Sequence, residues 1–334
     1  MMAENIKHVA IHDLVRNDEG FAVSLGKADF KVTPTARRVV DSLHDLYKQR
    51  VSKSHGQFAA DDDHYPTQAY LKAFKGSGYK DFGKLTIKLM EALKLRASRR
   101  GAATGGHVFF AHFERDKREY LLVTILNDKL GAAVTEELDV EDINHLDIDG
   151  FKFAGRINIT GWLNQEKRYI SFLKGKGNVA DYFKEFLGCD TAVQEKEDTL
   201  LLVKTMRAYA DTLGYDVAEK GEFLKKVRGI CHRHAHTGKE LDLTSFANEL
   251  FPEDPTDLIG ELAKAELNNG FIPNKSALGG LVKFQGKTPY WSLEFERDAI
   301  SSGDIKFDSA TGILTIKNLP EKLRRELNHE YGND

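Results

Sequence analysis

The chain has 334 residues, of which 41% are hydrophobic and 30% are charged, and its formal net charge at pH 7 is -3. This composition is typical of a soluble protein that buries a core, and the sequence lacks the run of about 18 apolar residues that would predict a membrane span. The opening residues lack the basic and apolar regions of a secretion signal, and two cysteines are too few for a disulfide framework. We therefore expect a cytoplasmic protein.

The charges are distributed unevenly along the chain. Residues 1–100 carry 18 Lys or Arg against 12 Asp or Glu, whereas residues 101–150 carry 4 against 11. Such alternation is compatible with a nucleic-acid-binding face on an otherwise acidic protein, and equally with solvated faces of no special function.

The first hundred residues predict two strands and then two helices. IKHVAIHDLV and FAVSLGKADFKV are typical of strands, with NDEG as the hairpin turn between them. Apolar spacing predicts helices over 35–51 and 82–100. The polar stretch SKSHGQFAADDDHYP between them predicts a loop.

The middle of the chain predicts further strands. HVFFAHF and EYLLVTIL read as a hairpin, and FKFAGRINIT and RYISFLK read as two more strands. The acidic segment EELDVEDINHLDIDG is expected to be a solvated loop. NVADYFKEFLG predicts a helix that ends at Gly188.

Helical patterns dominate after residue 190. FDSATGILTI predicts a hairpin near the end, and PEKLRRELNHEY predicts a closing helix. We predict an α+β fold with two domains. Residues 1–190 form a mixed antiparallel sheet with packed helices, and residues 191–334 form a mainly helical region ending in a small β-hairpin and a helix.

One glycine turn follows the pattern G-x-G-x-x-A at Gly175, Gly177 and Ala180. The strand before it is too polar for a buried dinucleotide-binding strand, and no βαβ repeat surrounds it. Lys174 and Lys176 flank the turn just before a predicted helix, an arrangement that favours phosphate. The alternative is a structural turn that needs a positive φ.

A cluster of acids could bind divalent metal. Five carboxylates fall within eleven residues, and carboxylate oxygens are preferred ligands of Ca²⁺ and Mg²⁺. The cluster consists of Asp139, Glu141, Asp142, Asp147 and Asp149. Its spacing does not match the EF-hand loop, and the chain carries no G-x-S-x-G, H-E-x-x-H, C-x-x-C or kinase signature. We therefore predict no catalytic residue, no metal and no cofactor, and keep a metal-dependent nuclease as the alternative.

Basic residues concentrate on the two predicted helices of the first hundred residues and beside the glycine turn. Lysine and arginine give sequence-independent affinity for phosphate, although each could equally lie on a solvated face. The DNA-binding candidates are Arg37, Arg38, Lys75, Arg96, Arg99, Arg100, Lys174 and Lys176.

Several motifs resemble the bacterial nucleoid-associated protein family called NdpA or YejK. VAIHDLV, GGHVFF, EYLLVTILN and AGRINIT follow that family's order, and RYISFLKGKGNVADYFKEFLG is the most specific part. DSATGILTIKNLPEKLRREL is similar to the family's closing segment. The resemblance covers nearly the whole chain and is weakest over 50–80 and 190–290.

The resemblance implies a cytoplasmic protein located on the nucleoid that binds double-stranded DNA, and it brings no defined set of functional residues. We expect contacts to the DNA backbone with little reading of bases. The sequence leaves open a homodimer, and also an adaptor whose acidic half binds a DNA-processing protein.

Overall fold

The computed structural model describes residues 5–18, 20–27, 30–100, 103–174, 181–190 and 195–332. The chain divides into two compact units. The first unit comprises Met1–Val193, Asp242–Thr244 and Leu262–Asn269, and the second comprises Gln194–Leu241, Ser245–Glu261 and Gly270–Asp334. Two short later segments thus complete the first unit. The predicted limits of 1–190 and 191–334 stay a prediction.

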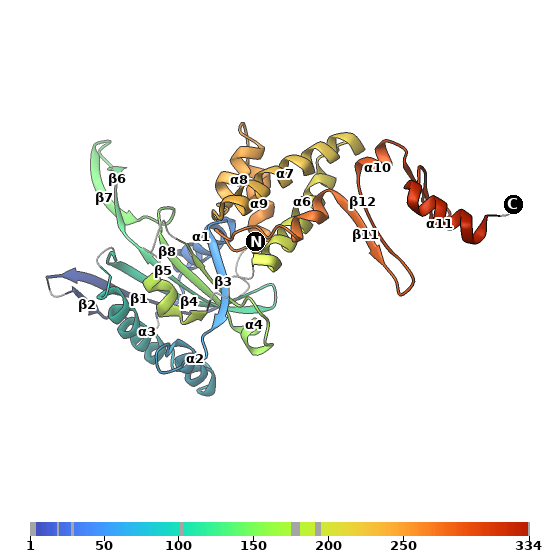
Figure 1. Ribbon diagram of the computed structural model, residues 1–334. Helices are drawn as coiled ribbons and strands as arrows, with labels where there is room; N and C mark the ends of the chain where they lie inside the picture. Colours follow the sequence, from blue (N-terminus) through green and yellow to red (C-terminus); the bar gives the residue numbers. More distant parts are fainter. Residues whose placement is uncertain are drawn as a thin grey trace. The chain divides into compact units, whose positions relative to one another are not determined.

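An eight-stranded sheet forms the frame of the first unit (Figure 1). Its strand order is β10-β3-β9-β8-β5-β4-β1-β2, and every neighbouring pair is antiparallel. The strands are β1 (Asn5–Asn17), β2 (Gly20–Ser24), β3 (Lys53–Phe58), β4 (Gly106–Arg115), β5 (Arg118–Leu126), β8 (Phe153–Asn158), β9 (Ile170–Leu173) and β10 (Cys189–Asp190). The predicted hairpins of β1 with β2 and of β4 with β5 are confirmed.

Helices cover both faces of this sheet. Phe110 on β4 lies in a core with residues of α2 (Thr67–Gly76), α3 (Phe82–Ala97) and α5 (Asp181–Leu187). The neighbouring Phe109 lies in a separate core with residues of α1 (Pro34–Gln49). Successive side chains of a strand point to opposite faces, so the doubly apolar sequence of β4 matches a central strand covered on both sides. A short helix, α4 (Ile159–Leu163), follows β8.

Local sequence signals set the ends of these helices. The side chain of Thr33 accepts a hydrogen bond from the Ala36 N–H at 3.1 Å and caps α1, which begins at a proline. Gly188 follows α5 with a φ of 65° and is the predicted C-terminal glycine.

The predicted loop over 52–66 is partly wrong because it contains β3. Lys53 and His55 are only 4% and 3% exposed, although both are polar. The Lys53 Nζ donates hydrogen bonds to the carbonyl oxygens of Tyr47 at 3.3 Å and Lys48 at 3.0 Å, at the end of α1. These bonds compensate the buried ammonium, and an apolar pattern could not reveal such a strand.

The acidic segment is also not a loop. Its central residues form β7 (Val140–Leu146), which pairs with β6 (Asp128–Val134) in a separate two-stranded ribbon. The β7 residues up to His145 are exposed, and for that reason the strand lacks the apolar alternation by which strands are predicted.

The second unit is mainly helical and carries small β-ribbons. Its helices are α6 (Glu195–Thr212), α7 (Val217–Thr237), α8 (Leu243–Leu250), α9 (Thr256–Lys264), η2 (Ala277–Leu281), α10 (Asp298–Ser301) and α11 (Glu321–Tyr331). The first two residues of α8 and the last three of α9 belong to the first unit. Its ribbons pair β11 (Lys283–Lys287) with β12 (Ser292–Glu296) and β13 (Ile305–Asp308) with β14 (Ile313–Ile316). The predicted α+β class, terminal hairpin and closing helix are confirmed. Across the described ranges, we find no helix whose length and apolarity suffice for crossing a membrane.

Two buried histidines predict loss of stability in acid. Burial, aided by nearby positive charges, lowers the pKa of His44 and of His112 from 6.5 to about 3. Between pH 6.5 and pH 3 the two histidines are protonated in the unfolded chain and neutral in the folded chain. Their contribution to the free energy of unfolding is therefore fully present above pH 6.5 and is lost as the pH falls towards 3. From pH 7 to pH 5 we expect each to lower the free energy of unfolding by about 2 kcal/mol.

Urea unfolding at both pH values measures this loss. His112 stacks on His8 and Phe82, and neither of its ring nitrogens has a hydrogen-bond partner among the described residues, so His112→Phe preserves the packing. From pH 7 to pH 5, the free energy of unfolding of the variant should fall by about 2 kcal/mol less than that of wild type. The exposed His329→Gln is the control and should follow wild type. Equal acid losses in His112→Phe and wild type would contradict the assignment.

Candidate nucleic-acid interface

The segment of helices α2 and α3, on one face of the sheet, carries an excess of positive charge. Residues 67–100 contain nine Lys or Arg against two Asp or Glu. Six of these basic side chains are exposed, and we call them the α2–α3 basic face. They are Lys72, Lys75, Lys80, Lys84, Lys88 and Arg99.

The packing of α2 against α3 positions these cations. Lys84 and Lys88 are four residues apart and therefore lie on the same side of α3. The Nζ of Lys88 lies 5.3 Å from the ring centre of Tyr70 on α2. Both lysines and Tyr70 line a groove of about 230 Å³ between the helices. The groove thus has a basic edge beside an aromatic ring.

The acids near this face form exposed ion pairs. Lys84 lies 3.2 Å from Asp81, and Lys72 lies 3.2 Å from Asp62. Exposed pairs of this kind are worth about 0–1 kcal/mol, so a phosphate group can replace the carboxylate at small cost.

The predicted site residues on α3 and just after its end have different roles. Arg99 is exposed, and Lys75 on α2 is exposed as well. Arg96 is only 8% exposed and donates from Nη2 to the carbonyl oxygen of His64. Its Nη1 lies 3.8 Å from Glu185 on α5, and Arg100 donates to the same carboxylate at 2.8 Å. Arg96 near the end of α3, and Arg100 just after it, therefore hold this end of α3 against α5.

The other predicted residues do not join this face. Arg37 and Arg38 begin α1, which packs on the opposite face of the sheet from α2 and α3. Lys174 is half-buried after β9, where its N–H donates to the Ser52 carbonyl at 2.7 Å. Lys176 and the glycine turn over 175–180 lie outside the described residues, so the predicted phosphate turn stays a prediction.

Lys84 and Lys88 belong to the face although they were not among the selected candidates. Their i, i+4 spacing on a predicted helix was the signal that could have identified them. Lys72 and Lys80 were harder to place because the helix α2 was not predicted.

The acidic segment does not form a metal centre in the described part of the chain. Glu141 and Asp142 are adjacent on β7, so their side chains point to opposite faces of the ribbon. Asp147 accepts a hydrogen bond from the Gly150 N–H at 3.1 Å. Among the described residues, no group of three or more histidines, cysteines or acids is placed to hold a metal ion.

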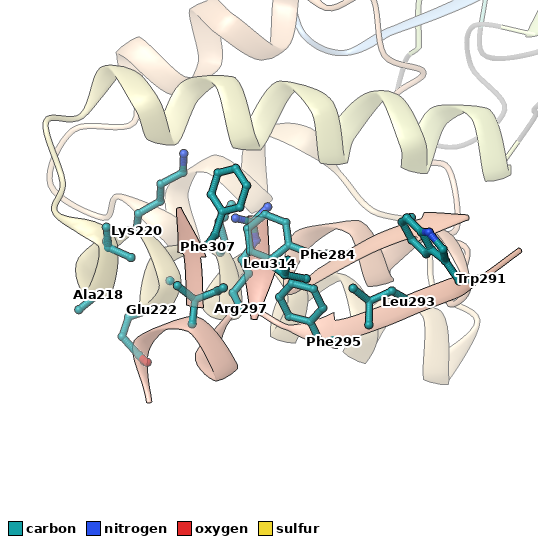
Figure 2. A pocket seen from close by; sticks show the side chains of 15 residues that line it. Ala218, Lys220, Glu222, Phe284, Trp291, Leu293, Phe295, Arg297, Phe307 and Leu314 are labelled. Atoms are coloured by element: carbon teal, nitrogen blue, oxygen red, sulfur yellow. The ribbon is translucent and has the colours of Figure 1, made fainter. Parts of the chain in front are cut away.

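The second unit contains an apolar groove of about 740 Å³ between α7 and the β-ribbons (Figure 2). Phe284, Phe295 and Phe307 gather around its centre, and Trp291 lies farther along the ribbon (Figure 2). The guanidinium carbon of Arg297 lies 4.1 Å from the ring centre of Phe284. The Arg297 Nε and Nη2 are buried and make no hydrogen bond among the described residues. The groove is thus mainly apolar, with the half-buried Arg297 in its lining.

Comparisons with known proteins give relatives of the same length. The family described as nucleoid-associated protein YejK matches residues 10–324. A nucleoid-associated protein of Metapseudomonas resinovorans is 28% identical over 330 residues, covering 96% of this chain and 98% of that protein. One from Pseudomonas savastanoi pv. phaseolicola is 30% identical over 334 residues, with 96% and 98% coverage. The similarity extends across both units.

Proposed function

Because this chain belongs to the family of nucleoid-associated protein YejK, we propose that it binds double-stranded DNA on the nucleoid and catalyses no reaction. The observation that carries the proposal is the α2–α3 basic face, whose six exposed cations lie in a segment, 67–100, that has nine basic residues against two acids. The protein as a whole is acidic, so a confined basic surface would orient it on DNA.

The composition of this face favours contacts to phosphates over reading of bases. Five of its six cations are lysines, which act as point charges on flexible stems. Base recognition more often uses the planar fork of arginine or the amides of asparagine and glutamine. We therefore propose binding that is largely independent of DNA sequence.

A salt series of duplex binding tests this proposal. If six cations each neutralise one phosphate, the logarithm of the binding constant should fall with the logarithm of salt concentration at a slope of about -5. Two duplexes of unrelated sequence should give the same slope and similar affinity. A flat salt response, or strong preference for one sequence, would overturn the backbone mechanism.

We further propose that the protein forms a homodimer through its second unit. None of the α11 residues is buried, and Leu323, Leu327 and Tyr331 repeat every four residues with exposed fractions of 43%, 41% and 78%. An unpartnered apolar stripe of this kind marks an interaction surface. Glu326 and Glu330 lie on the same side of the helix as the leucines.

The apolar groove of a second copy has the matching chemistry. Its aromatic lining fits the leucine stripe, and Glu326 or Glu330 of another α11 would supply an acceptor to the Arg297 nitrogens that make no hydrogen bond among the described residues. Helix and groove belong to the same unit, so two copies can exchange equivalent contacts. A dimer would also double the number of phosphate contacts.

Replacing Leu323 and Leu327 with glutamate should therefore convert a dimer into a monomer, as measured by sedimentation. Arg325→Glu changes the charge by the same amount on the opposite side of α11, where the Arg325 side chain is exposed, and should leave the dimer intact. A wild type that is monomeric at all concentrations would refute the homodimer. The groove would then be expected to bind a different protein, such as one that processes DNA.

A further inference from the structure

A polar recess of about 240 Å³ interrupts the apolar face of the sheet that α1 covers. Arg156 on β8 pairs with Ser171 on β9, and Ser171 pairs with His55 on β3, so the three side chains form a row across the sheet. Leu122 on β5 extends the same row and is fully buried in the α1 core. Three polar residues thus occupy positions where the pattern of the sheet calls for apolar ones.

The recess is rich in positive charge. Arg118, Arg156 and Arg168 line it, against the two acids Glu166 and Glu266. The buried Lys53 lies two residues before His55 on β3. Burial lowers the pKa of His55, and the positive charges of Lys53, Arg168 and Arg156 lower it further. The imidazole is therefore neutral, and the surroundings favour a negative charge.

The guanidinium of Arg156 is positioned by an aromatic ring and a distant carboxylate. The guanidinium carbon of Arg156 lies 4.7 Å from the ring centre of Tyr120, and its Nη2 is 4.0 Å from Glu266. That distance exceeds the roughly 2.7–2.9 Å of a charge-assisted hydrogen bond, so a closer acceptor would be favoured. Arg168 donates to the Glu266 carbonyl oxygen at 3.0 Å.

His55 provides an independent sign of a missing ligand. The residue is 3% exposed and lines the recess, and its backbone N–H donates to the Asn268 Oδ1 at 2.6 Å. Its Nε2 is buried and makes no hydrogen bond among the described residues. A buried polar atom without a partner costs about 1–3 kcal/mol, and a ligand oxygen in the recess would remove that cost.

We propose that this recess binds a single phosphate group, either free orthophosphate or the terminal phosphate monoester of a nucleotide. The planar fork of arginine matches phosphate oxygens, and Ser171 and His55 supply neutral hydrogen-bonding groups. The recess is smaller than the roughly 300–1,000 Å³ of drug-sized pockets, which suits a single phosphate group. The two glutamates in its wall would repel the neighbouring phosphates of a continuous DNA backbone.

Calorimetric titration of the full chain with inorganic phosphate, and separately with adenosine monophosphate, tests the site. Wild type should bind one equivalent, and Arg156→Gln should bind at least about tenfold more weakly because a charge-assisted contact is lost. Arg233→Gln is the matched control, since Arg233 pairs with Glu249 at 2.6 Å in the second unit, and it should bind like wild type. Tighter binding of the nucleotide would identify a nucleotide as the source of the phosphate, and equal binding would identify phosphate itself.

Thermal unfolding gives a second readout. Phosphate should raise the melting temperature of wild type and of Arg233→Gln, and should raise that of Arg156→Gln less at the same phosphate concentration. If Arg156→Gln does not fold, Arg168→Gln serves in its place, because Arg168 also lines the recess. The absence of saturable heat and of a thermal shift with both probes, or equal affinity in wild type and both recess variants, would overturn the proposal.

Discussion

Replacing Lys84 and Lys88 together with glutamate is expected to weaken duplex binding by at least about tenfold at physiological salt. The salt slope should become shallower by about 2, because two phosphate contacts are lost. The Lys84 side chain is 78% exposed and lies in the first turn of α3, where a glutamate is favoured by the helix dipole. The fold should therefore survive the change, and fluorescence anisotropy with a labelled duplex measures the loss.

The control for this experiment changes the net charge equally elsewhere. Lys239→Glu/Lys322→Glu alters two exposed lysines of the second unit and should keep both affinity and salt slope near wild type. If the control loses as much affinity, the affinity for DNA depends on the overall charge of the protein and not on this face. If neither variant loses affinity, the α2–α3 basic face does not contact DNA.

Arg96→Ala should lower the free energy of unfolding by about 2–4 kcal/mol, even though Arg96 was predicted to contact DNA. Its guanidinium is buried, bonded to the His64 carbonyl, paired with Glu185 and 5.4 Å from the ring centre of Tyr65. Removing it leaves the carbonyl without its donor and the carboxylate with Arg100 alone. Denaturant unfolding measures the loss, and DNA affinity per folded molecule should stay near wild type.

Arg99→Ala is the matched comparison, because Arg99 lies three residues farther along the chain and is exposed. Its stability should stay within about 0.5 kcal/mol of wild type, whereas its salt slope for DNA should become shallower by about 1. The opposite pattern, with Arg96 controlling affinity and Arg99 controlling stability, would contradict the roles assigned to both.

The strongly patterned parts of the fold could be predicted from the sequence. The β4–β5 hairpin is apolar on both faces because both are covered, and the start of α1 is marked by Thr33 and Pro34. Strand β3 could not be predicted, because Lys53 and His55 are buried by tertiary contacts that the local sequence pattern does not reveal. Strand β7 escaped for the opposite reason, since its residues are almost all exposed.

The candidate site could be predicted only in part, because charge counts do not report direction. Arg96 and Arg99 look equivalent in the sequence, yet one points into the contact with α5 and the other into solvent. Arg37 and Arg38 add to the same regional charge from the other side of the sheet. The sequence did not predict the polar recess, because its residues come from β3, β5, β8, β9, the segment just before β9 and the segment near Glu266.

The way β3 is completed has a consequence for folding during synthesis. The edge strand β10 pairs with Gln57 and Phe58 at the end of β3. The start of β3 is hydrogen-bonded instead by residues 268 and 269. The Asn269 N–H donates to the Lys53 carbonyl at 2.8 Å, and Asn268 accepts from the His55 N–H. A nascent chain that has emerged as far as Asp190 already holds all eight strands, yet these two backbone groups still lack their partners. The first unit can therefore reach its final state only after residue 269 has left the ribosome.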